Sequence, residues 1–492
     1  MASLVVWRVG WGAMIAWWAW DYLTSGRVRY LYVEPKFHFT YTLFDWVRPW
    51  PGVGMYLHFL ALAAVGLLVA SGCLYRLASL LWAAGFTYVF LLEKTNYQNH
   101  YYLMLLIGWW MPWLPLHRAV SVDAAWHPGL AQDTVPAWTL WVLRFHIALP
   151  YFFGGVAKLD PDWLTGMPMR QMLSMHAHWP LIGPLLTRDA IVALFTWGGL
   201  LFDLTIVPLL LWRPTRALGY AWCMAFHLLN SILFDIHLFP WLMLLASTLF
   251  FEPDWPRRIL SGKPLSLPPP QPQPWRELPV STRLGLVAAS LYVVFHVWWP
   301  LRHHLYPGDA SWTEQGHFFA WRMMLRNKQA VVRYYLTDPQ LGRTWNPNLR
   351  PYLSDMQASR FPRDPEMILE LGQFLARQYE QKTGRRLEVR ALALASLNGR
   401  KPQLLIDPQV DLTRLRRGQL HRPWVMPQAE LLPEKAWHLP PTVWERHLEL
   451  PALPPVTGPP GDWTPEQRDS SEARWLTRPS GAVPAVVRIR LL

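Results

Sequence analysis

Apolar segments of spanning or near-spanning length recur through the first 300 residues, and they limit the possible folds more than any other feature of this chain. A straight membrane span needs about 20 apolar residues, and several of these segments are shorter or carry polar groups. We therefore expect a multi-pass membrane protein in contact with lipid. It should have about eight helices, some short or broken, in Leu4–Trp20, Val53–Leu74, Leu77–Leu92, Tyr101–Trp113, Leu140–Val156, Ile191–Trp212, Ala217–Phe250 and Leu284–Pro300.

The composition of the chain changes near residue 300, where charged residues and prolines become more frequent. DPEMILELGQFLARQYEQKTG predicts an amphipathic helix with Asp364 as N-cap and Gly384 as stop. The dipeptide Asn398-Gly399 between alternating segments predicts a β-hairpin. The predicted fold is a predominantly α polytopic membrane domain, then a smaller mixed α/β soluble domain, then a proline-rich irregular tail, at residues 1–300, 301–430 and 431–492.

Charge and cysteine content limit the possible partners. The formal net charge of +13 suits an anionic lipid surface or an acidic substrate. The arginines are scattered and no nucleic-acid motif is present, so we expect no nucleic-acid partner. With only Cys73 and Cys223, a disulfide framework is not expected. The segment LPPPQPQPW, residues 267–275, predicts a polyproline connector before the last span.

A lysine follows the apolar run in LPYFFGGVAKLDPDW. On a helix, Lys158 would share a face with Gly154 and Gly155, which leave room for a flat ligand or a close neighbouring helix. A desolvated lysine loses its preference for the charged form, and a neutral amine can act as a general base. The structural alternative is a lysine that extends to the membrane surface while the following aspartates meet water.

Polar residues also interrupt the apolar pattern in LLEKTNYQNHYYLM, Leu91–Met104. Asn96 and His100 stand four residues apart, so we predict that they share a helix face. Their amide and imidazole could then bind an oxygen-rich ligand. The structural alternative is a hairpin between two short spans, capped by Glu93 and Lys94.

A third polar cluster lies in AFHLLNSILFD, where His227, Asn230 and Ser231 would share one helix face. Hydrogen bonds between helices explain this cluster at least as well as ligand binding does.

The patterns typical of metal and nucleotide chemistry are missing. Membrane di-iron enzymes carry repeated HxxxH and HxxHH clusters, whereas this chain has MHAH at 175–178 and the pair His303–His304 without a partner set. It also has no GxGxxG, no Walker loop and no nucleophile elbow. We therefore expect no metal cofactor.

Several of these segments resemble motifs of the vitamin K-dependent γ-glutamyl carboxylases. EKTNYQNHYYL is similar to that family's DKTSWNNHSYL, GGVAKLDPDWLTG to AGVKKLDADWVEG, and FHLLNSILF to FHCMNSQLF. The similarity continues through VDAAWHP, WRMML and IDPQVDL, in matching order over most of residues 1–430. The chain thus resembles a bacterial-type homologue with an HTTM-like membrane domain.

The resemblance implies an enzyme of the peptidyl-glutamate carboxylase type that uses vitamin K hydroquinone, O2 and CO2. In this family a lysine deprotonates the hydroquinone, O2 adds to the anion, and the resulting strong base ends as the 2,3-epoxide. That base removes a γ-proton from a peptidyl glutamate, and the carbanion attacks CO2. The implied partners are reduced quinone and a glutamate-containing peptide or protein, with the soluble domain on the non-cytosolic side.

Matching positions identify candidate site residues. Lys158 matches the family's base, and His100 matches a residue placed at the glutamate transformation, so these two are the predicted catalytic residues. The residues predicted to bind the quinone are Tyr97, Asn99, Gly154, Gly155, His227 and Asn230. Those predicted to bind the peptide substrate are His317, Trp321, Met323, Met324 and Lys328.

The segment around Trp321 departs from the family. The family's WDMMVHSRSH is WRMMLRNKQA here, so Arg326 and Ala330 replace histidines and Lys328 replaces an arginine. His317 stands where the family has a tyrosine linked to carboxylation. The propeptide-recognition region is represented by HRPWVMPQ, residues 421–428. Hydroquinone oxygenation is therefore better supported by the sequence than peptide carboxylation.

Three functions are compatible with the sequence. The first is a membrane carboxylase that couples hydroquinone epoxidation to glutamate carboxylation. The second is an epoxidase of the same descent that does not carboxylate peptide. The third is a non-catalytic membrane protein that binds quinone or lipid.

Overall fold

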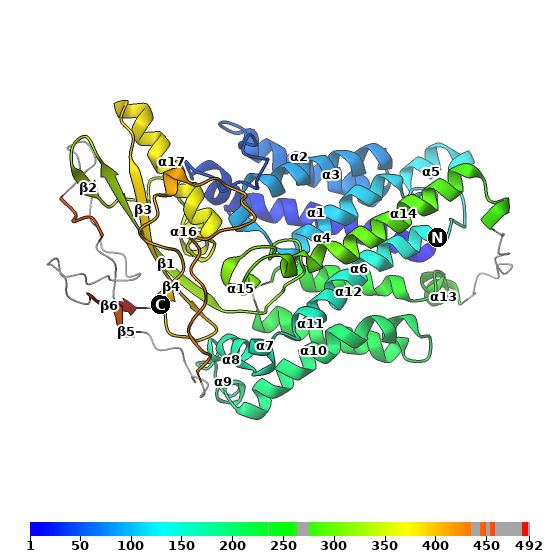
Figure 1. The fold of residues 1–492 in the computed structure, drawn as a ribbon. Helices are drawn as coiled ribbons and strands as arrows, with labels where there is room; N and C mark the ends of the chain where they lie inside the picture. The colour runs from blue at the N-terminus through cyan, green and yellow to red at the C-terminus, as the bar shows by residue number, and fades with distance from the viewer. Residues whose placement is uncertain (235, 263–274, 434–442, 449–452, 458–484, 491–492) are drawn as a thin grey trace.

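A computed structural model shows a bundle of helices with a small sheet at one end (Figure 1). It describes residues 1–234, 236–262, 275–433, 443–448, 453–457 and 485–490. The predicted fold class is confirmed, while nearly all of the predicted polyproline connector lies outside the described residues. The helices of the bundle and its connections are α1 Ala2–Thr24, α2 Gly54–Ser71, α3 Tyr75–Leu92, α4 Asn99–Trp110, α5 Val122–Trp126, α6 Trp138–Ala157, α7 Pro161–Leu164, α8 Met167–Ser174, α9 Gly183–Leu186, α10 Asp189–Leu211, α11 Arg216–Leu233, α12 Phe239–Ser247, α13 Trp255–Ser261 and α14 Val280–Trp298.

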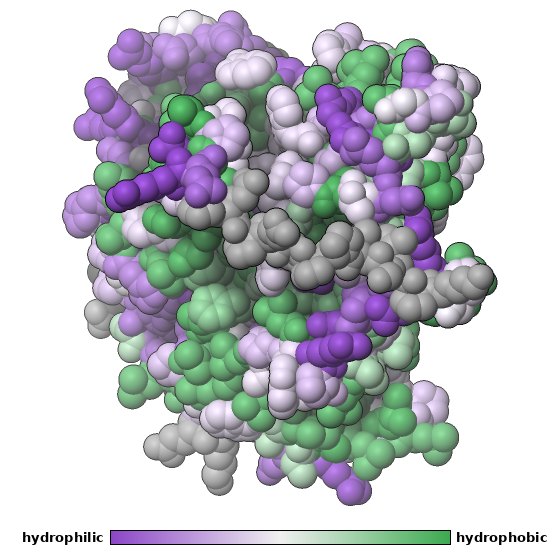
Figure 2. Space-filling view, turned by 90° about the vertical axis from the view of Figure 1, so that its right-hand side faces the viewer, coloured by the Kyte–Doolittle hydropathy of each residue, from purple (hydrophilic) through white to green (hydrophobic). Residues whose placement is uncertain are grey.

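Five helices in the described part of the chain are long and apolar enough to cross a membrane, namely α2, α3, α6, α10, and α14 with the turn that follows it. Helices α1 and α11 have 23 and 18 residues but are less apolar. The segment predicted at 217–250 is divided into α11 and α12. Seen from the end away from the sheet, hydrophobic side chains cover much of the lower half of the molecule (Figure 2). This exposed apolar surface suits contact with lipid.

Small residues bring α1 and α2 into close contact. A Cβ added at Gly12 of α1 would clash with the backbone nitrogen of Ala70, and one at Gly66 of α2 would lie 2.8 Å from that of Ala16. Close backbone approach of this kind stabilises membrane helix pairs through van der Waals contact, because lipid provides no hydrophobic driving force between helices.

The soluble part is an antiparallel sheet covered by α17, Pro365–Thr383, with the strand order β2-β1-β3-β4. The predicted helix is confirmed, since the Asp364 side chain accepts from the Glu366 N–H and Gly384 has φ of 72°. The predicted hairpin is confirmed as well, with Asn398 and Gly399 at φ of 53° and 83° between β3 and β4. The remaining elements are α15 Ala310–Thr313, α16 Asp355–Arg360, β1 Lys328–Asp338, β2 Arg343–Trp345, β3 Glu388–Leu397 and β4 Gln403–Leu404.

At their junction, the membrane part and the soluble part each contribute side chains to the other's hydrophobic core. Phe37 and Phe39, from the loop before α2, belong to the hydrophobic core of the sheet and α17. Trp321, from the segment before β1, belongs to the core of the helical bundle. The two parts therefore pack as one unit. Farther along, in the region predicted to be irregular, β5 Val443–Leu448 pairs with β6 Ala485–Arg490.

Glu370 of α17 is buried at this junction. One of its oxygens accepts hydrogen bonds from the N–H and the hydroxyl of Thr40 and lies 3.1 Å from Arg417. Burial raises the pKa of Glu370 to about 7, although Arg417 and Thr40 act in the opposite direction. Because the folded state holds the proton more tightly than the unfolded state, this group's stabilising contribution is full below its unfolded pKa and is lost as pH rises through 7.

Substituting Glu370→Gln should remove this pH dependence. Between pH 5 and pH 8, the free energy of unfolding of the variant should fall less than that of the wild type, by about 2 to 3 kcal/mol. Denaturant unfolding in detergent at several pH values measures the difference. Glu34→Gln, at an exposed ion pair with Arg29, is the control and should follow the wild type. Equal pH slopes for Glu370→Gln and wild type would contradict the prediction.

Candidate active site

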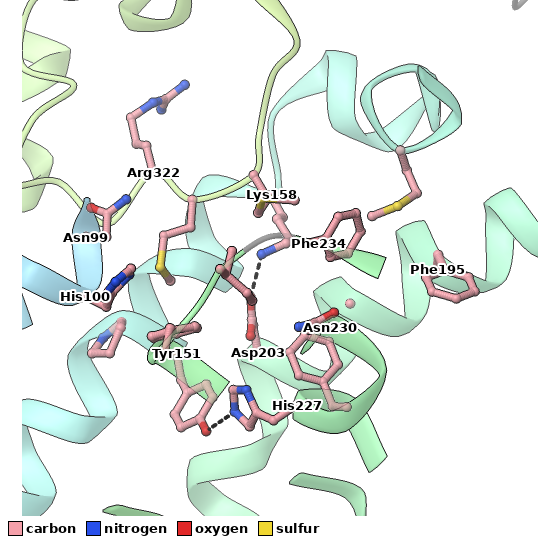
Figure 3. A pocket seen from close by; sticks show the side chains of 18 of the residues that line it. Asn99, His100, Tyr151, Lys158, Phe195, Asp203, His227, Asn230, Phe234 and Arg322 are labelled. Atoms are coloured by element: carbon pink, nitrogen blue, oxygen red, sulfur yellow. Dashed lines mark hydrogen bonds and ion pairs between the residues drawn. The ribbon is translucent and has the colours of Figure 1, made fainter. Parts of the chain in front are cut away.

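A cavity of 260 Å³ lies between α4, α6, α10, α11 and the segment after Trp321 (Figure 3). This volume is close to the lower end of the range for small-molecule pockets, about 300 to 1,000 Å³. Of the residues predicted from the sequence, the cavity brings together Asn99, His100, Lys158, His227, Asn230, Met323 and Met324. Its lining also includes residues that were not predicted, among them Trp163, Met169, Phe195, Gly199, Asp203, Phe226, Phe234, Phe239 and Arg322.

Lys158 is the C-cap of helix α6, and its side chain points into the bundle rather than to the membrane surface. The residue is 6% exposed. Its Nζ lies 2.5 Å from Oδ2 of Asp203 on α10 and 5.3 Å from the ring centre of Trp163. The alternative in which Lys158 extends to the surface is therefore wrong.

Asp203 is the main residue of the cavity that sequence reasoning missed. It is 5% exposed, and its carboxylate forms a buried ion pair with the adjacent lysine. The prediction from sequence considered the amine without this partner. A signal was present, because Asp203 interrupts the apolar run GGLLFDLTIVPLLL, and ionisable residues within membrane helices often mark functional sites.

Gly154 and Gly155 lie outside the cavity lining and let α6 approach α10. A Cβ at Gly154 would lie 3.2 Å from Oδ2 of Asp203 and 3.1 Å from Cε of Met323. A Cβ at Gly155 would lie 2.7 Å from Cδ2 of Leu204. The sequence suggested that these glycines leave room either for a flat ligand or for a close neighbouring helix. The structure shows the close neighbouring helix.

Substituting Gly155→Ala should therefore lower the free energy of unfolding by about 1 to 3 kcal/mol, since the added methyl overpacks the contact between α6 and α10. Thermal unfolding in detergent measures the loss. Gly198→Ala on α10 is the matched control, because a Cβ there meets nothing within 4 Å. A Gly155→Ala variant as stable as Gly198→Ala would show that the two helices do not depend on this close approach.

Two imidazoles line the cavity. His100 is buried at the start of α4, and its Nε2 has no hydrogen-bond partner among the described residues. The Nε2 of His227 lies 2.7 Å from the Tyr151 hydroxyl, while its Nδ1 has no partner in the described part of the chain. Each histidine thus has one buried ring nitrogen without a hydrogen-bond partner in the described part of the chain. No group of three or more His, Cys, Asp and Glu side chains within the described ranges is placed to hold a metal ion.

Tyr97 does not line the cavity, but it contacts a residue that does. Its hydroxyl donates to Oδ1 of Asn99 and accepts from the backbone N–H of Phe319. Tyr97 therefore fixes Asn99, which lines the cavity, and ties it to the soluble part.

The segment Leu91–Met104 is not one continuous helix. A 3₁₀ turn at Lys94–Asn96 precedes α4, and the amide of Asn96 donates to the hydroxyls of Tyr22 and Tyr32. The prediction that Asn96 and His100 share a helix face is therefore wrong. The chain turns between them because the backbone of Tyr97 and Gln98 is extended rather than helical.

The charged residues of this segment join the two parts of the molecule. Nζ of Lys94 lies 2.7 Å from Oδ2 of Asp364, the N-cap of α17. Glu93 caps the 3₁₀ turn through the Thr95 N–H and also accepts a hydrogen bond of 2.7 Å from Gln357. Both groups are buried. They explain why a membrane chain keeps charge here.

The peptide-binding residues predicted around Trp321 divide into two groups. Met323 and Met324 line the cavity, whereas Trp321 packs against Tyr102 at 4.9 Å between ring centres. Phe319, Trp321 and Met324 have φ of 61°, 55° and 55°. Such values strain residues with side chains, and strain of this kind clusters at functional sites.

Two of the residues that differ from the family, Arg326 and Lys328, form an ion cluster with the buried Glu314. Arg326 and Lys328 both contact Glu314, with the Lys328 Nζ 3.0 Å from its Oε1. Burial lowers the pKa of Lys328 to about 8, and burial together with Arg326 and Arg322 lowers the pKa of His317. His317 and Lys328 are not among the residues that line the cavity.

Arg322 borders the cavity, but its guanidinium points away from Lys158 (Figure 3). It donates to the Ser311 hydroxyl at 2.9 Å and lies 3.6 Å from Asp160. A second link runs from Asp162 to Arg400 at 2.5 Å. The aspartates that follow Lys158 thus join the membrane part to the soluble part, although both side chains remain partly exposed.

Comparison with known families agrees with this architecture. Residues 1–255 match the family described as HTTM domain, and residues 281–430 match that described as vitamin K-dependent gamma-carboxylase, lumenal domain. The first match alone covers more than half of the chain. No solved structure matches the chain significantly.

The fold and these matches define a multi-pass membrane protein with a carboxylase-type lumenal domain. The chain belongs to the vitamin K-dependent γ-carboxylase family, as the sequence motifs indicated. The lumenal-domain match indicates an enzyme of the peptidyl-glutamate carboxylase type.

Proposed function

We propose that this chain oxygenates vitamin K hydroquinone to the 2,3-epoxide and uses the strong base so formed to carboxylate peptidyl glutamate with CO2. The observation that supports this most directly is the meeting of Lys158, Asn99 and His100 in one cavity. These residues come from α4 and the end of α6. They are also the residues that matched the family's base, quinone and glutamate positions.

The lining suits a reduced quinone. Aromatic side chains from α10, α11 and α12 form apolar walls for a flat ring, namely Phe195, Phe226 and Phe239. Ring nitrogens of His100 and His227 supply polar groups without partners in the described part of the chain. In this arrangement Lys158 accepts a proton from the bound hydroquinone, and Asn99 and His100 orient oxygen atoms. The apolar walls exclude water, which would quench a strong base.

The peptide substrate should approach from the soluble part. Met323 and Met324 reach the cavity from the segment before β1, so a glutamate side chain could enter beside them. The family description of residues 281–430 as a lumenal domain supports a non-cytosolic position for this part.

A second candidate is epoxide formation without carboxylation. The cluster of Glu314, Arg326 and Lys328 favours it. The family has other residues at positions 326 and 328, and we expect those residues to bind glutamate and peptide. In this chain both cations instead contact an internal carboxylate.

One assay separates the candidates. Purified protein in nanodiscs receives vitamin K hydroquinone, O2, labelled bicarbonate and glutamate-containing peptides. Epoxide together with labelled peptide is the expected result. Epoxide without label would support the second candidate, and quinone binding without epoxide would point to a non-catalytic binding protein.

A further inference from the structure

The Lys158–Asp203 pair raises a chemical problem for a lysine base. Nζ of Lys158 and Oδ2 of Asp203 are 2.5 Å apart, and both residues are buried. As this ion pair, Lys158 is an ammonium, and an ammonium has no lone pair with which to accept a proton. If Lys158 is to deprotonate the hydroquinone, it must first transfer its own proton to another group.

Asp203 is placed to receive that proton. Within the described residues, its carboxylate accepts a hydrogen bond from Lys158 alone, and the side chain lines the same cavity (Figure 3). In apolar surroundings an ion pair loses the solvation that favours two separated charges. A neutral amine beside a neutral carboxylic acid therefore becomes accessible to the pair.

We propose that Asp203 is the proton-holding partner of Lys158, so that the base is the pair rather than the amine alone. This inference rests on the proposed function. The N–H bond of the ammonium breaks as an O–H bond forms on Asp203, which leaves a neutral amine. That amine then accepts the hydroquinone proton, which breaks the quinol O–H bond and forms a new N–H bond.

The balance of charge favours this sequence. Before transfer, the pair and the quinol carry no net charge. Afterwards, the ammonium of Lys158, the neutral acid of Asp203 and the quinol monoanion again sum to zero. No charge has to enter the cavity from water, and the new ammonium lies beside the anion that it stabilises. Asp203 thus acts on the quinol through Lys158, by holding the proton that the amine gives up.

The decisive variant is Asp203→Asn, which keeps the shape of the side chain but cannot hold the proton. If the pair is the base, epoxide formation should fall about 100-fold or more across the pH range, while quinone binding persists. Asp203→Glu should recover part of the rate. If the amine acts alone, loss of the carboxylate should instead favour the neutral amine, so activity would persist and extend to lower pH. That result would overturn the proposal.

Asp189→Asn is the matched control. Asp189 begins the same helix, and its exposed side chain pairs with Arg170 away from the cavity. This variant should keep the wild-type rate and pH profile. A loss equal to that of Asp203→Asn would show that any weakened ion pair on α10 disables the enzyme, and would overturn a specific role for Asp203.

An infrared measurement tests the proton transfer without turnover. Under anaerobic conditions, hydroquinone is added to wild type and to Asp203→Asn. The carbonyl stretch of a protonated carboxylic acid should appear in the wild type and be absent from the variant. If wild type binds hydroquinone without this band, Asp203 does not take the proton, even where epoxide forms in air. Failure of the proposed function would appear separately, as absence of epoxide from the wild type.

Discussion

Substituting Lys158→Ala should lower the rate of epoxide formation by about 10²- to 10⁴-fold. The reason is that the variant removes the one amine that lines the cavity in the described part of the chain. Expression and quinone binding should be largely retained, since the apolar walls are unchanged. The measurement is the epoxide yield from vitamin K hydroquinone in nanodiscs, with quinone binding followed in parallel.

A second variant separates chemistry from stability. Removing Lys158 leaves Asp203 as a buried charge without its partner, and breaking a buried ion pair in this way costs about 3 to 5 kcal/mol. The double variant Lys158→Ala/Asp203→Asn removes both charges, so it should regain stability and remain inactive. Unchanged epoxide yield in either variant would remove Lys158 from the mechanism.

Substituting Lys94→Met should destabilise the junction between the membrane and soluble parts. Lys94 and Asp364 are 8% and 4% exposed, and the substitution leaves the aspartate without its cation. The free energy of unfolding should fall by about 3 to 5 kcal/mol. Denaturant unfolding in detergent, followed by the fluorescence of the tryptophans, measures this loss.

Two variants serve as controls for Lys94→Met, and the first keeps the N-cap of α17. In the double variant Lys94→Met/Asp364→Asn both charges are gone, while asparagine still caps the helix, so most of the stability should return. Arg29→Met, at an exposed pair with Glu34, should cost no more than about 1 kcal/mol. A Lys94→Met variant as stable as Arg29→Met would show that the buried pair does not hold the two parts together.

Local patterns in the sequence were sufficient for much of the fold. Hydrophobic segments, the Asp364 cap, the Gly384 stop and the Asn398-Gly399 turn each act over a few residues, so they are visible without tertiary contacts. The same approach failed at Asn96. It assumed continuous helical spacing from Asn96 to His100, but the backbone at Tyr97 and Gln98 is extended rather than helical.

Motif spacing also located much of the candidate site. Asn99, His100, Lys158, His227 and Asn230 came from polar residues inside apolar segments, and all of them line one cavity. Tyr97, His317, Trp321 and Lys328 were drawn from the same motifs but lie outside that lining, along with the two glycines. A motif gives the neighbours of a functional residue along the chain, whereas the direction of each side chain depends on the packing of the helix that carries it.

The sequence by itself determined a membrane bundle followed by a mixed soluble domain, the position of α17, the hairpin, and the family to which the chain belongs. Only the tertiary structure decided that Lys158 meets Asp203, that Lys94 meets Asp364, and that Arg326 and Lys328 share Glu314. Helix and strand periods order residues within one element, but each of these ion pairs joins separate segments. Such contacts form where burial in a common core brings charges together and requires them to be paired.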